Sequence, residues 1–262
     1  FARWGYFPID STGPHGHLSA LPAATIRGFD RVLAYTMWGK DVIERSCRYP
    51  VDWIPHGINF DIFQPREKER GRRLLGQRVH DDDLLVGVVM TNQTRKDWGL
   101  AFHAASILKE KHRNLRLWCH TDVLQRYWDL RALAADFGID RLTIITTTFT
   151  DTELSHLYSA CDITMLPSLG EGFGYPIVES LACGTPVVHG NYGGGSELIP
   201  RKEWLVDPKT YRLDTIYNCL RPVFDPHEWA AVMERVIEEK PDPQECRRAV
   251  EHLSWQLLWP SC

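Results

Sequence analysis

The chain has 262 residues, of which 44% are hydrophobic and 24% are charged, and its formal net charge at pH 7 is -4. These values are typical of a globular protein with one large core or two modest ones, and they exclude a disordered or coiled-coil chain. The longest basic cluster, residues 66–73, is interrupted by Glu67 and Glu69, so it cannot follow a nucleic acid backbone. We therefore expect no nucleic acid partner.

The sequence carries no clear targeting signal. No apolar run approaches the roughly 18 residues that a membrane span needs, and no signal peptide opens the chain. We expect no transmembrane segment and a cytoplasmic location, with peripheral membrane contact left open. Because the sequence begins with Phe1 rather than Met, we also expect a piece of a longer chain.

The first 60 residues resemble the end of an α/β domain. The runs "RVLAYT" (31–36) and "VDWIPH" (51–56) read as two strands on either side of a helix, "WGKDVIERSC" (38–47). The charged stretch "NFDIFQPREKERGRR" (59–73) that follows is typical of a connection between domains.

From residue 84 onward, short apolar runs alternate with amphipathic helical stretches. The runs are apolar throughout, which suits strands covered on both faces, and their alternation with helices predicts a parallel sheet with right-handed crossovers. This pattern predicts a Rossmann-like α/β domain. The expected strands lie at 84–90, 114–120, 142–146, 162–167 and 185–190.

One loop of this domain has the features of a ligand site. In "DITMLPSLGEGFGYPIVESLACG" (162–184) a strand precedes a glycine-rich loop, and a helix begins near Tyr175. Ligands of parallel α/β sheets bind at such strand ends, and the free N–H groups of a helix start favour an anion such as a diphosphate. Gly172 and Gly174 let the backbone come close to a ligand.

Two carboxylates flank this turn. Glu171 lies in the loop and Glu179 about one turn into the helix, where carboxylates can accept paired hydrogen bonds from vicinal hydroxyls. Two hydroxylated rings on either side of a diphosphate describe a nucleotide sugar. The alternative is that the acidic residues only complement the helix dipole, and a lone Gly-x-Gly is a weak signal.

The segment "EGFGYPIVE" (171–179) resembles the E-x7-E motif of family 4 retaining glycosyltransferases, which have the GT-B architecture of two facing Rossmann-like domains. Two further stretches strengthen the resemblance. "GGGSE" (193–197) is similar to the family's GGxPE with Ser196 in place of proline, and "WIPHGINFDIFQP" (53–65) to the segment joining its two domains.

The resemblance implies a domain organisation. Residues 1–60 would be the C-terminal part of an N-terminal, acceptor-side domain, and 61–83 the interdomain linker. Residues 84–240 would be the complete donor-binding domain. Residues 241–262 would form a helix that packs back on the first domain, with Trp255 and Trp259 as packing anchors.

The resemblance also implies roles for particular residues. Glu179 would bind the donor's ribose hydroxyls, and Glu171 would contact the donor sugar near the reacting centre. Arg95 and Lys96, at a strand end, would neutralise the departing diphosphate. The set expected to contact the donor is completed by Gly172, Phe173, Gly174, Tyr175, Asn92, Thr148 and Phe149.

Several of these assignments have alternatives. Thr91 stands where relatives commonly have an arginine, which Arg95 would replace, and the basic pair could instead be a solvated strand end. Thr148 and Phe149 would lie beside the nucleobase, although Thr147 replaces a usual glycine and Phe149 could be plain core. Asp10, in "YFPID", would bind an acceptor hydroxyl or merely cap a turn.

The expected activity is transfer of a sugar, hexosyl or mannosyl, from a UDP- or GDP-sugar to a carbohydrate or glycoconjugate hydroxyl with retention of configuration. The resemblance implies no metal and no cofactor, and His15 and His17 alone are a weak metal signal. Two other readings stay open: a non-catalytic nucleotide-sugar-binding module and a GT-B epimerase.

Overall fold

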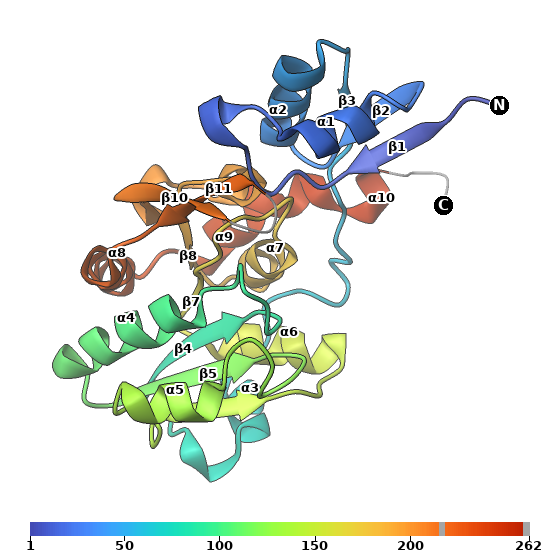
Figure 1. Ribbon diagram of the computed structural model, residues 1–262. Coiled ribbons are helices and arrows are strands. Elements are labelled where there is room, and N and C mark those ends of the chain that lie inside the picture. The colour runs from blue at the N-terminus through green and yellow to red at the C-terminus, as the bar shows by residue number, and fades with distance from the viewer. Residues whose placement is uncertain (215–217, 259–262) are drawn as a thin grey trace.

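The computed structural model describes residues 1–214 and 218–258, and these form two α/β parts that face each other (Figure 1). Within them, the strands make a three-stranded sheet, a six-stranded sheet and a two-stranded hairpin. No helix among these residues is long and apolar enough to cross a membrane.

The smaller part is N-terminal. Its parallel sheet has the order β1 (Trp4–Phe7), β2 (Arg31–Ala34), β3 (Asp52–Trp53), and its helices are α1 (Ala20–Ile26) and α2 (Met37–Cys47), with a 3-10 turn η1 (Pro14–Gly16). Its buried side chains, among them Val32 and Ile43, form a core cluster of their own. The two strands expected around the helix are present, and β1 adds a third.

The larger part contains a six-stranded parallel sheet with the order β6-β5-β4-β7-β8-β9. Its strands are β4 (Leu84–Val89), β5 (Leu115–His120), β6 (Thr143–Thr146), β7 (Ile163–Leu166), β8 (Val187–Gly190) and β9 (Leu205–Val206). Each apolar run singled out in the sequence forms one of these strands. The predicted α/β class with a parallel sheet is therefore confirmed.

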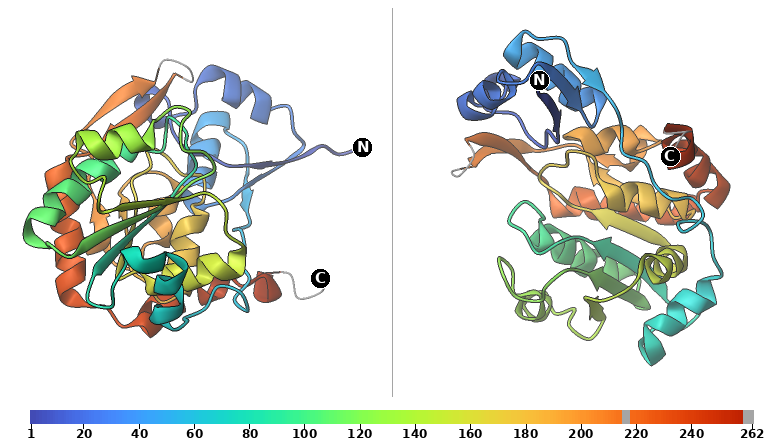
Figure 2. Two further views of the ribbon diagram at one scale, coloured as in Figure 1. Left: turned by 90° about the horizontal axis from the view of Figure 1, so that it is seen from below. Right: turned by 90° about the vertical axis from the view of Figure 1, so that its right-hand side faces the viewer.

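Helices cover both faces of this sheet (Figures 1 and 2). One layer packs α4 (Trp98–Lys111) against α5 (Leu130–Asp136) and α8 (Pro226–Glu239), and the other contains α3 (Lys68–Leu74), α6 (Asp151–Ala160), α7 (Tyr175–Ala182) and α9 (Pro243–Val250). Short 3-10 turns complete it: η2 (Gly76–Arg78), η3 (Gly194–Leu198), η4 (Lys202–Trp204) and η5 (Glu251–Leu253).

Helix boundaries follow local sequence signals. Thr150 begins α6 with a capping box, in which its hydroxyl accepts from the N–H of Glu153 and the Glu153 carboxylate accepts from the N–H of Thr150. Asp97 caps α4 through the N–H of Leu100 at 3.0 Å. These caps set where α4 and α6 begin in the segments that follow β4 and β6.

The stretch 61–83 is packed rather than extended. Helix α3 lies against α6, and the buried Arg72 pairs with Asp162 at 3.2 Å. This helix was not predicted, because its charged, polar sequence is typical of a linker. The proposed domain boundaries themselves stay a prediction.

The C-terminal segment packs on the larger part and on the chain that connects the two parts. Helix α9 lies against α7, with Cys246 and Val250 buried in the main core. Helix α10 (Trp255–Leu258) follows, and the Trp255 ring lies against Gly57. Trp259, the other expected anchor, lies outside the described residues.

A hairpin that the sequence did not predict reaches toward the N-terminal part (Figure 2). It consists of antiparallel strands β10 (Thr210–Asp214) and β11 (Cys219–Val223). The N–H of Leu220 donates to Thr12 O at 2.6 Å. The Tyr192 hydroxyl ties the same two segments, accepting from Thr12 N at 3.1 Å and donating to Leu220 O at 2.8 Å. The hairpin thus joins the two parts beside their interface.

Candidate active site

The sheet order brings two loops together that are far apart in the sequence. Strands β4 and β7 are neighbours, so the segments that leave their carboxyl ends run side by side. Leu169 N donates to Arg95 O at 2.8 Å, and Asp97 N donates to Pro167 O at 2.9 Å. These backbone bonds hold the basic pair beside the glycine-rich loop.

Arg95, Lys96 and Glu171 form a charged cluster there. The Lys96 ammonium contacts Glu171 Oε1, and Arg95 Nη1 lies 3.3 Å from Glu171 Oε2 and 2.8 Å from Gly170 O. Burial alone would raise the pKa of Glu171, but the neighbouring Lys96 and Arg95 hold that pKa at about 2. Glu171 is therefore a carboxylate at neutral pH, with two cations against it.

The turn after Glu171 depends on glycine at two positions. Gly174 has a φ of 107° and a ψ of 61°, a left-handed conformation that other residues rarely adopt, and it begins α7. A Cβ on Gly172 would lie 2.8 Å from Pro8 Cβ, so glycine allows the loop to approach the N-terminal part. Phe173 is buried, whereas Tyr175 is exposed and stacks on His56 at 5.3 Å between ring centroids.

Glu179 lies in α7 within reach of the same space. Its Oε2 accepts a hydrogen bond from the Tyr158 hydroxyl at 2.7 Å. Burial raises the pKa of Glu179 to about 7, although the hydrogen bond from Tyr158 acts in the opposite direction. The two glutamates of the motif therefore differ: Glu171 is fully ionised at neutral pH, and Glu179 titrates there.

These groups line one pocket, here called the strand-end pocket, with a volume of about 580 Å³. It lies at the carboxyl ends of β4 and β5 and is closed on the other side by Pro8, Tyr35 and His56 of the N-terminal part. The sequence-predicted residues that line it are Arg95, Lys96, Glu171, Gly172, Phe173, Gly174, Tyr175 and Glu179.

Four other predicted residues are not among those that line it. The Asn92 side chain donates to Val123 O and Trp128 O and accepts from Trp128 N, so it holds a loop in place. Thr147 lines the pocket where Thr148 and Phe149 were expected, and the Phe149 ring lies beside His120. Asp10 lies beyond Arg95, whose Nε is 3.8 Å from Asp10 Oδ2.

Tyr35 and His56 are among the pocket residues that the sequence did not single out. Tyr35 and His56 follow β2 and β3, and their rings lie 4.1 Å apart between centroids. Both strands end at the interface between the two parts. A polar aromatic residue shortly after each strand was the feature of the sequence that could have indicated a pocket residue. In the described ranges no three His, Cys, Asp or Glu side chains are grouped so as to hold a metal ion.

The loop "GGGSE" connects the two parts at another point. Glu197 accepts hydrogen bonds from the backbone N–H groups of Met37 and Trp38, at the start of α2. A carboxylate at a helix N-terminus is favoured by the free N–H groups and the dipole. This loop therefore helps to place the N-terminal part over the strand-end pocket.

The fold and this pocket define a class of protein. It is a two-part α/β protein in which carboxylates and cations, at parallel strand ends, line a pocket between the two parts. Residues 84–239 match the family model described as Glycosyl transferases group 1, and the chain belongs to that family.

Curated relatives are similar to the chain over most of its length. It is 30% identical to the D-inositol 3-phosphate glycosyltransferase of Thermobifida fusca (strain YX) over 213 residues, which is 78% of this chain and 46% of the relative. It is 28% identical to the MMP alpha-(1->4)-mannosyltransferase of Mycolicibacterium hassiacum over 78% of this chain and 45% of the relative. The chain thus spans about half the length of these relatives.

Solved structures share the fold. Anabaena Alr3699/HepE, in complex with UDP and glucose, superposes with a TM-score of 0.75 and 16% identity, over 96% of this chain and 67% of that one. Sucrose-phosphate synthase from Thermosynechococcus elongatus gives a TM-score of 0.73 and 21% identity, over 90% of this chain and 57% of that one. These matches place the chain in the GT-B fold.

Proposed function

We propose that the protein to which this chain belongs transfers a sugar from a nucleotide-diphosphate-sugar donor to an acceptor hydroxyl, with retention of the anomeric configuration. The observation that carries the proposal is the strand-end pocket. It sets Glu179 on one side of the Gly172–Gly174 turn and the cluster of Glu171, Arg95 and Lys96 on the other.

Each group has a role in the proposal. The Glu179 carboxylate accepts hydrogen bonds from the ribose hydroxyls, and Arg95 and Lys96 bind the diphosphate. The start of α7 adds backbone N–H donors next to the phosphates. Glu171 then contacts the donor sugar. When the donor binds, its diphosphate replaces part of the ion pairing that Arg95 and Lys96 make with Glu171.

The proposed reaction relies on orientation and charge stabilisation. The bond between the anomeric carbon and the diphosphate oxygen breaks, and the acceptor oxygen forms the new bond on the same face. The acceptor proton passes to the departing diphosphate. Arg95 and Lys96 stabilise the negative charge that develops on the leaving group. Retention and this front-face course rest on the resemblance of residues 171–179 to the E-x7-E motif.

The donor and acceptor are proposed at the level of class. The complex of a solved neighbour with UDP and glucose, and the mannosyltransferase among the curated relatives, support a UDP- or GDP-hexose. The acceptor is a carbohydrate or glycoconjugate, and no metal is required. A cytoplasmic location stays a prediction from the sequence.

The test is calorimetric titration of the chain with UDP, GDP, ADP and their sugar conjugates. We expect one nucleotide to bind, and Glu179→Ala to weaken it about 10- to 100-fold, since hydrogen bonds to charged groups contribute about 1.5–3 kcal/mol. Glu238→Ala, an exposed position on α8, is the matched control.

Product analysis separates the alternatives. Formation of a glycosylated acceptor supports transfer. Conversion of the nucleotide sugar without acceptor supports an epimerase. Binding with neither transfer nor donor hydrolysis, even when the complete first domain is present, supports a binding module. If no nucleotide binds, the assignment of the strand-end pocket fails.

A further inference from the structure

The hairpin of β10 and β11 reaches the loop that carries Glu171 through one side chain. Arg221 of β11 is buried, with its side chain 4% exposed, and its Nη1 donates to Leu169 O at 3.4 Å. A Cβ on Gly170 would lie 2.1 Å from Asp10 O and 2.5 Å from Arg221 Nη1, so glycine allows these segments to approach each other closely. No role proposed above uses Arg221.

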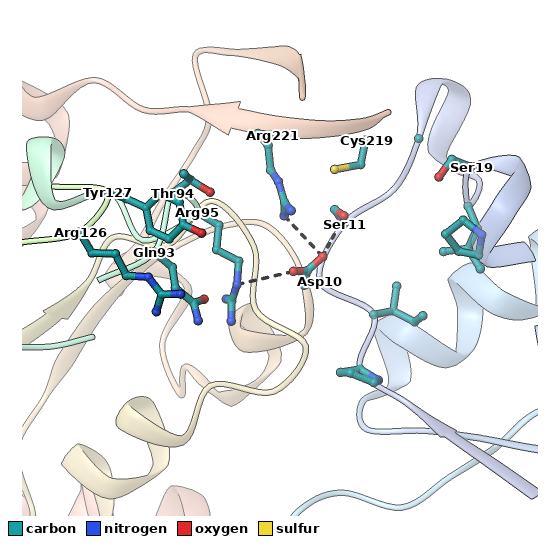
Figure 3. A pocket seen from close by; sticks show the side chains of 15 residues that line it. Asp10, Ser11, Ser19, Gln93, Thr94, Arg95, Arg126, Tyr127, Cys219 and Arg221 are labelled. Atoms are coloured by element: carbon teal, nitrogen blue, oxygen red, sulfur yellow. Dashed lines mark hydrogen bonds and ion pairs between the residues drawn. The ribbon is translucent and has the colours of Figure 1, made fainter. Parts of the chain in front are cut away.

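Arg221 begins a chain of ion pairs that leads to Glu171. Its Nη1 lies 3.5 Å from Asp10 Oδ1, and the other oxygen of that carboxylate, Oδ2, lies 3.8 Å from Arg95 Nε. Arg95 Nη1 in turn lies 3.3 Å from Glu171 Oε2. Figure 3 shows the Asp10 carboxylate between the two guanidinium groups. One carboxylate therefore pairs with two arginines, one from the hairpin and one from the strand-end pocket.

The two arginines are held to different extents. Arg221 is fixed from a second side, because its Nε also lies 3.5 Å from Asp214 Oδ2. Arg95 keeps 30% of its side chain exposed and donates through Nη1 to Gly170 O at 2.8 Å, while its Nη2 makes no hydrogen bond to any described residue. Guanidinium groups bind phosphate oxygens through paired N–H donors. Arg95 thus has a donor group left for a phosphate oxygen.

Asp10 competes with a bound diphosphate for Arg95, since a carboxylate and a phosphate are both anionic acceptors for a guanidinium group. The 3.8 Å between Asp10 Oδ2 and Arg95 Nε is too long for a hydrogen bond. Arg221 contacts the same carboxylate at the shorter distance of 3.5 Å and from a buried position, where water and salt screen the attraction less. Arg221 therefore keeps Asp10 from closing on Arg95.

We propose that Arg221 is a positioning residue for the diphosphate site: it holds Asp10 and so leaves Arg95 free to bind the donor's diphosphate. Without Arg221, Asp10 pairs closely with Arg95, and the diphosphate has to displace that carboxylate. The hairpin then sets the affinity of the strand-end pocket, although Arg221 is not among the residues that line that pocket. This role of Arg221 rests on the proposed transferase function.

The test is a double-mutant cycle measured by calorimetric titration of the chain with UDP, GDP, uridine and guanosine. We expect Arg221→Gln to weaken binding of the preferred nucleoside diphosphate about tenfold, the scale of one hydrogen bond to a charged group, and to leave binding of the matching nucleoside unchanged. In a chain that also carries Asp10→Asn, the same substitution should change diphosphate affinity by less than about twofold, because no carboxylate is left to compete.

Two controls separate positioning from net charge and from loss of folding. Arg126 lies near Arg95 in Figure 3 but makes no ion pair with a described residue, so Arg126→Gln removes the same charge without releasing Asp10. It should change diphosphate affinity by less than about twofold. If Arg221→Gln fails to fold, Asp10→Asn alone decides. It releases Arg95 and should raise diphosphate affinity about threefold, and a fall would overturn the inference.

The remaining outcomes are distinct. An equal loss from Arg221→Gln with and without Asp10→Asn, or an equal loss from Arg126→Gln, would reduce Arg221 to a long-range charge and overturn the inference. A loss as large for the nucleoside as for the diphosphate would do the same. Diphosphate binding that depends on Glu179 but not on Arg221 leaves the transferase function standing and removes only the role of Arg221. If neither UDP nor GDP binds, the proposed function fails and the role of Arg221 fails with it.

Discussion

The strand-end pocket and a second pocket, lined by Asp10, Arg95, Arg126 and Arg221 among others and called the hairpin pocket, are built in different ways on the two sides of Arg95. The strand-end pocket draws most of its charged residues from loops at the ends of neighbouring strands in one sheet. The hairpin pocket joins segments around residues 10, 95, 126 and 221 from both parts of the molecule. Sheet order therefore places the residues of one site, whereas docking of the two parts places those of the other.

The two pockets also differ in how far their cationic side chains are paired with carboxylates. In the strand-end pocket, Glu171 pairs with Lys96 and Arg95, so the cations are held before a ligand arrives. In the hairpin pocket, Arg95 and Arg221 share the Asp10 carboxylate at the longer distances of 3.8 Å and 3.5 Å. Substitutions in the strand-end pocket should therefore weaken both folding and ligand binding, and substitutions in the hairpin pocket should change mainly ligand binding.

The largest effect is expected from Lys96→Ala. It leaves the buried Glu171 with only the more distant Arg95 contact, and breaking a buried ion pair costs about 3–5 kcal/mol. We expect the free energy of unfolding in urea titrations to fall by that amount, and nucleotide-diphosphate affinity to fall with it. Lys111→Ala, at the exposed end of α4, is the control. An unchanged stability and affinity would remove Lys96 from the proposed site.

The next effect is a pH dependence from Glu179. Because its pKa is about 7, the ionised fraction rises from about one tenth at pH 6 to about nine tenths at pH 8. If the carboxylate binds the ribose, nucleotide affinity rises about tenfold over that range. Tyr158→Phe removes the hydrogen bond that favours the carboxylate, so the midpoint should move to higher pH.

The raised pKa of Glu179 also makes the free energy of unfolding depend on pH. Glu179 binds a proton more tightly in the folded chain than in the unfolded chain, where its pKa is near 4.5. Its contribution to the free energy of unfolding therefore decreases as pH rises from 4.5 to 7. Glu179→Gln should remove this decrease in urea titrations made at several pH values. A pH profile of affinity that Glu179→Gln leaves intact would assign the titration to another group.

Tyr192→Phe tests how the hairpin pocket is held together. The substitution removes the hydroxyl that bonds Thr12 N and Leu220 O, and leaving such backbone groups unpaired costs about 1–3 kcal/mol. We expect faster amide hydrogen exchange in β11 and little change in β4 and β5. Tyr211→Phe on the same hairpin is the control. Equal acceleration in both regions would mean that the two pockets do not unfold separately.

The smallest effect is expected from Glu197→Gln. The carboxylate accepts from Met37 N and Trp38 N, and its charge at the start of α2 contributes about 0.3–1 kcal/mol. We expect that loss in urea titrations at low salt and a smaller loss at high salt. Glu238→Gln should show neither. A loss that salt does not reduce would argue for hydrogen bonding rather than charge.

Much of the strand-end pocket was predictable. Glu171, Arg95 and Lys96 line it from the segments that follow strands located by the apolar pattern, and Glu179 lines it from the helix that begins after the glycine turn. The failures have local causes. The side chain of Asn92 is hydrogen-bonded to Val123 and Trp128 in the loop before α5. The periodicity of apolar residues carries no information about hydrogen bonds between a side chain and a loop.

The parallel sheet, the helix starts and the carboxylates around the glycine turn follow from the sequence alone. These depend on apolar runs, caps and glycine conformations, which are properties of short stretches of chain. The hairpin, its docking through Tyr192, and the contact of Asp10 with Arg221 beside Arg95 depend on the tertiary structure. Those contacts join residues up to about two hundred positions apart, and nothing in either local stretch encodes its partner.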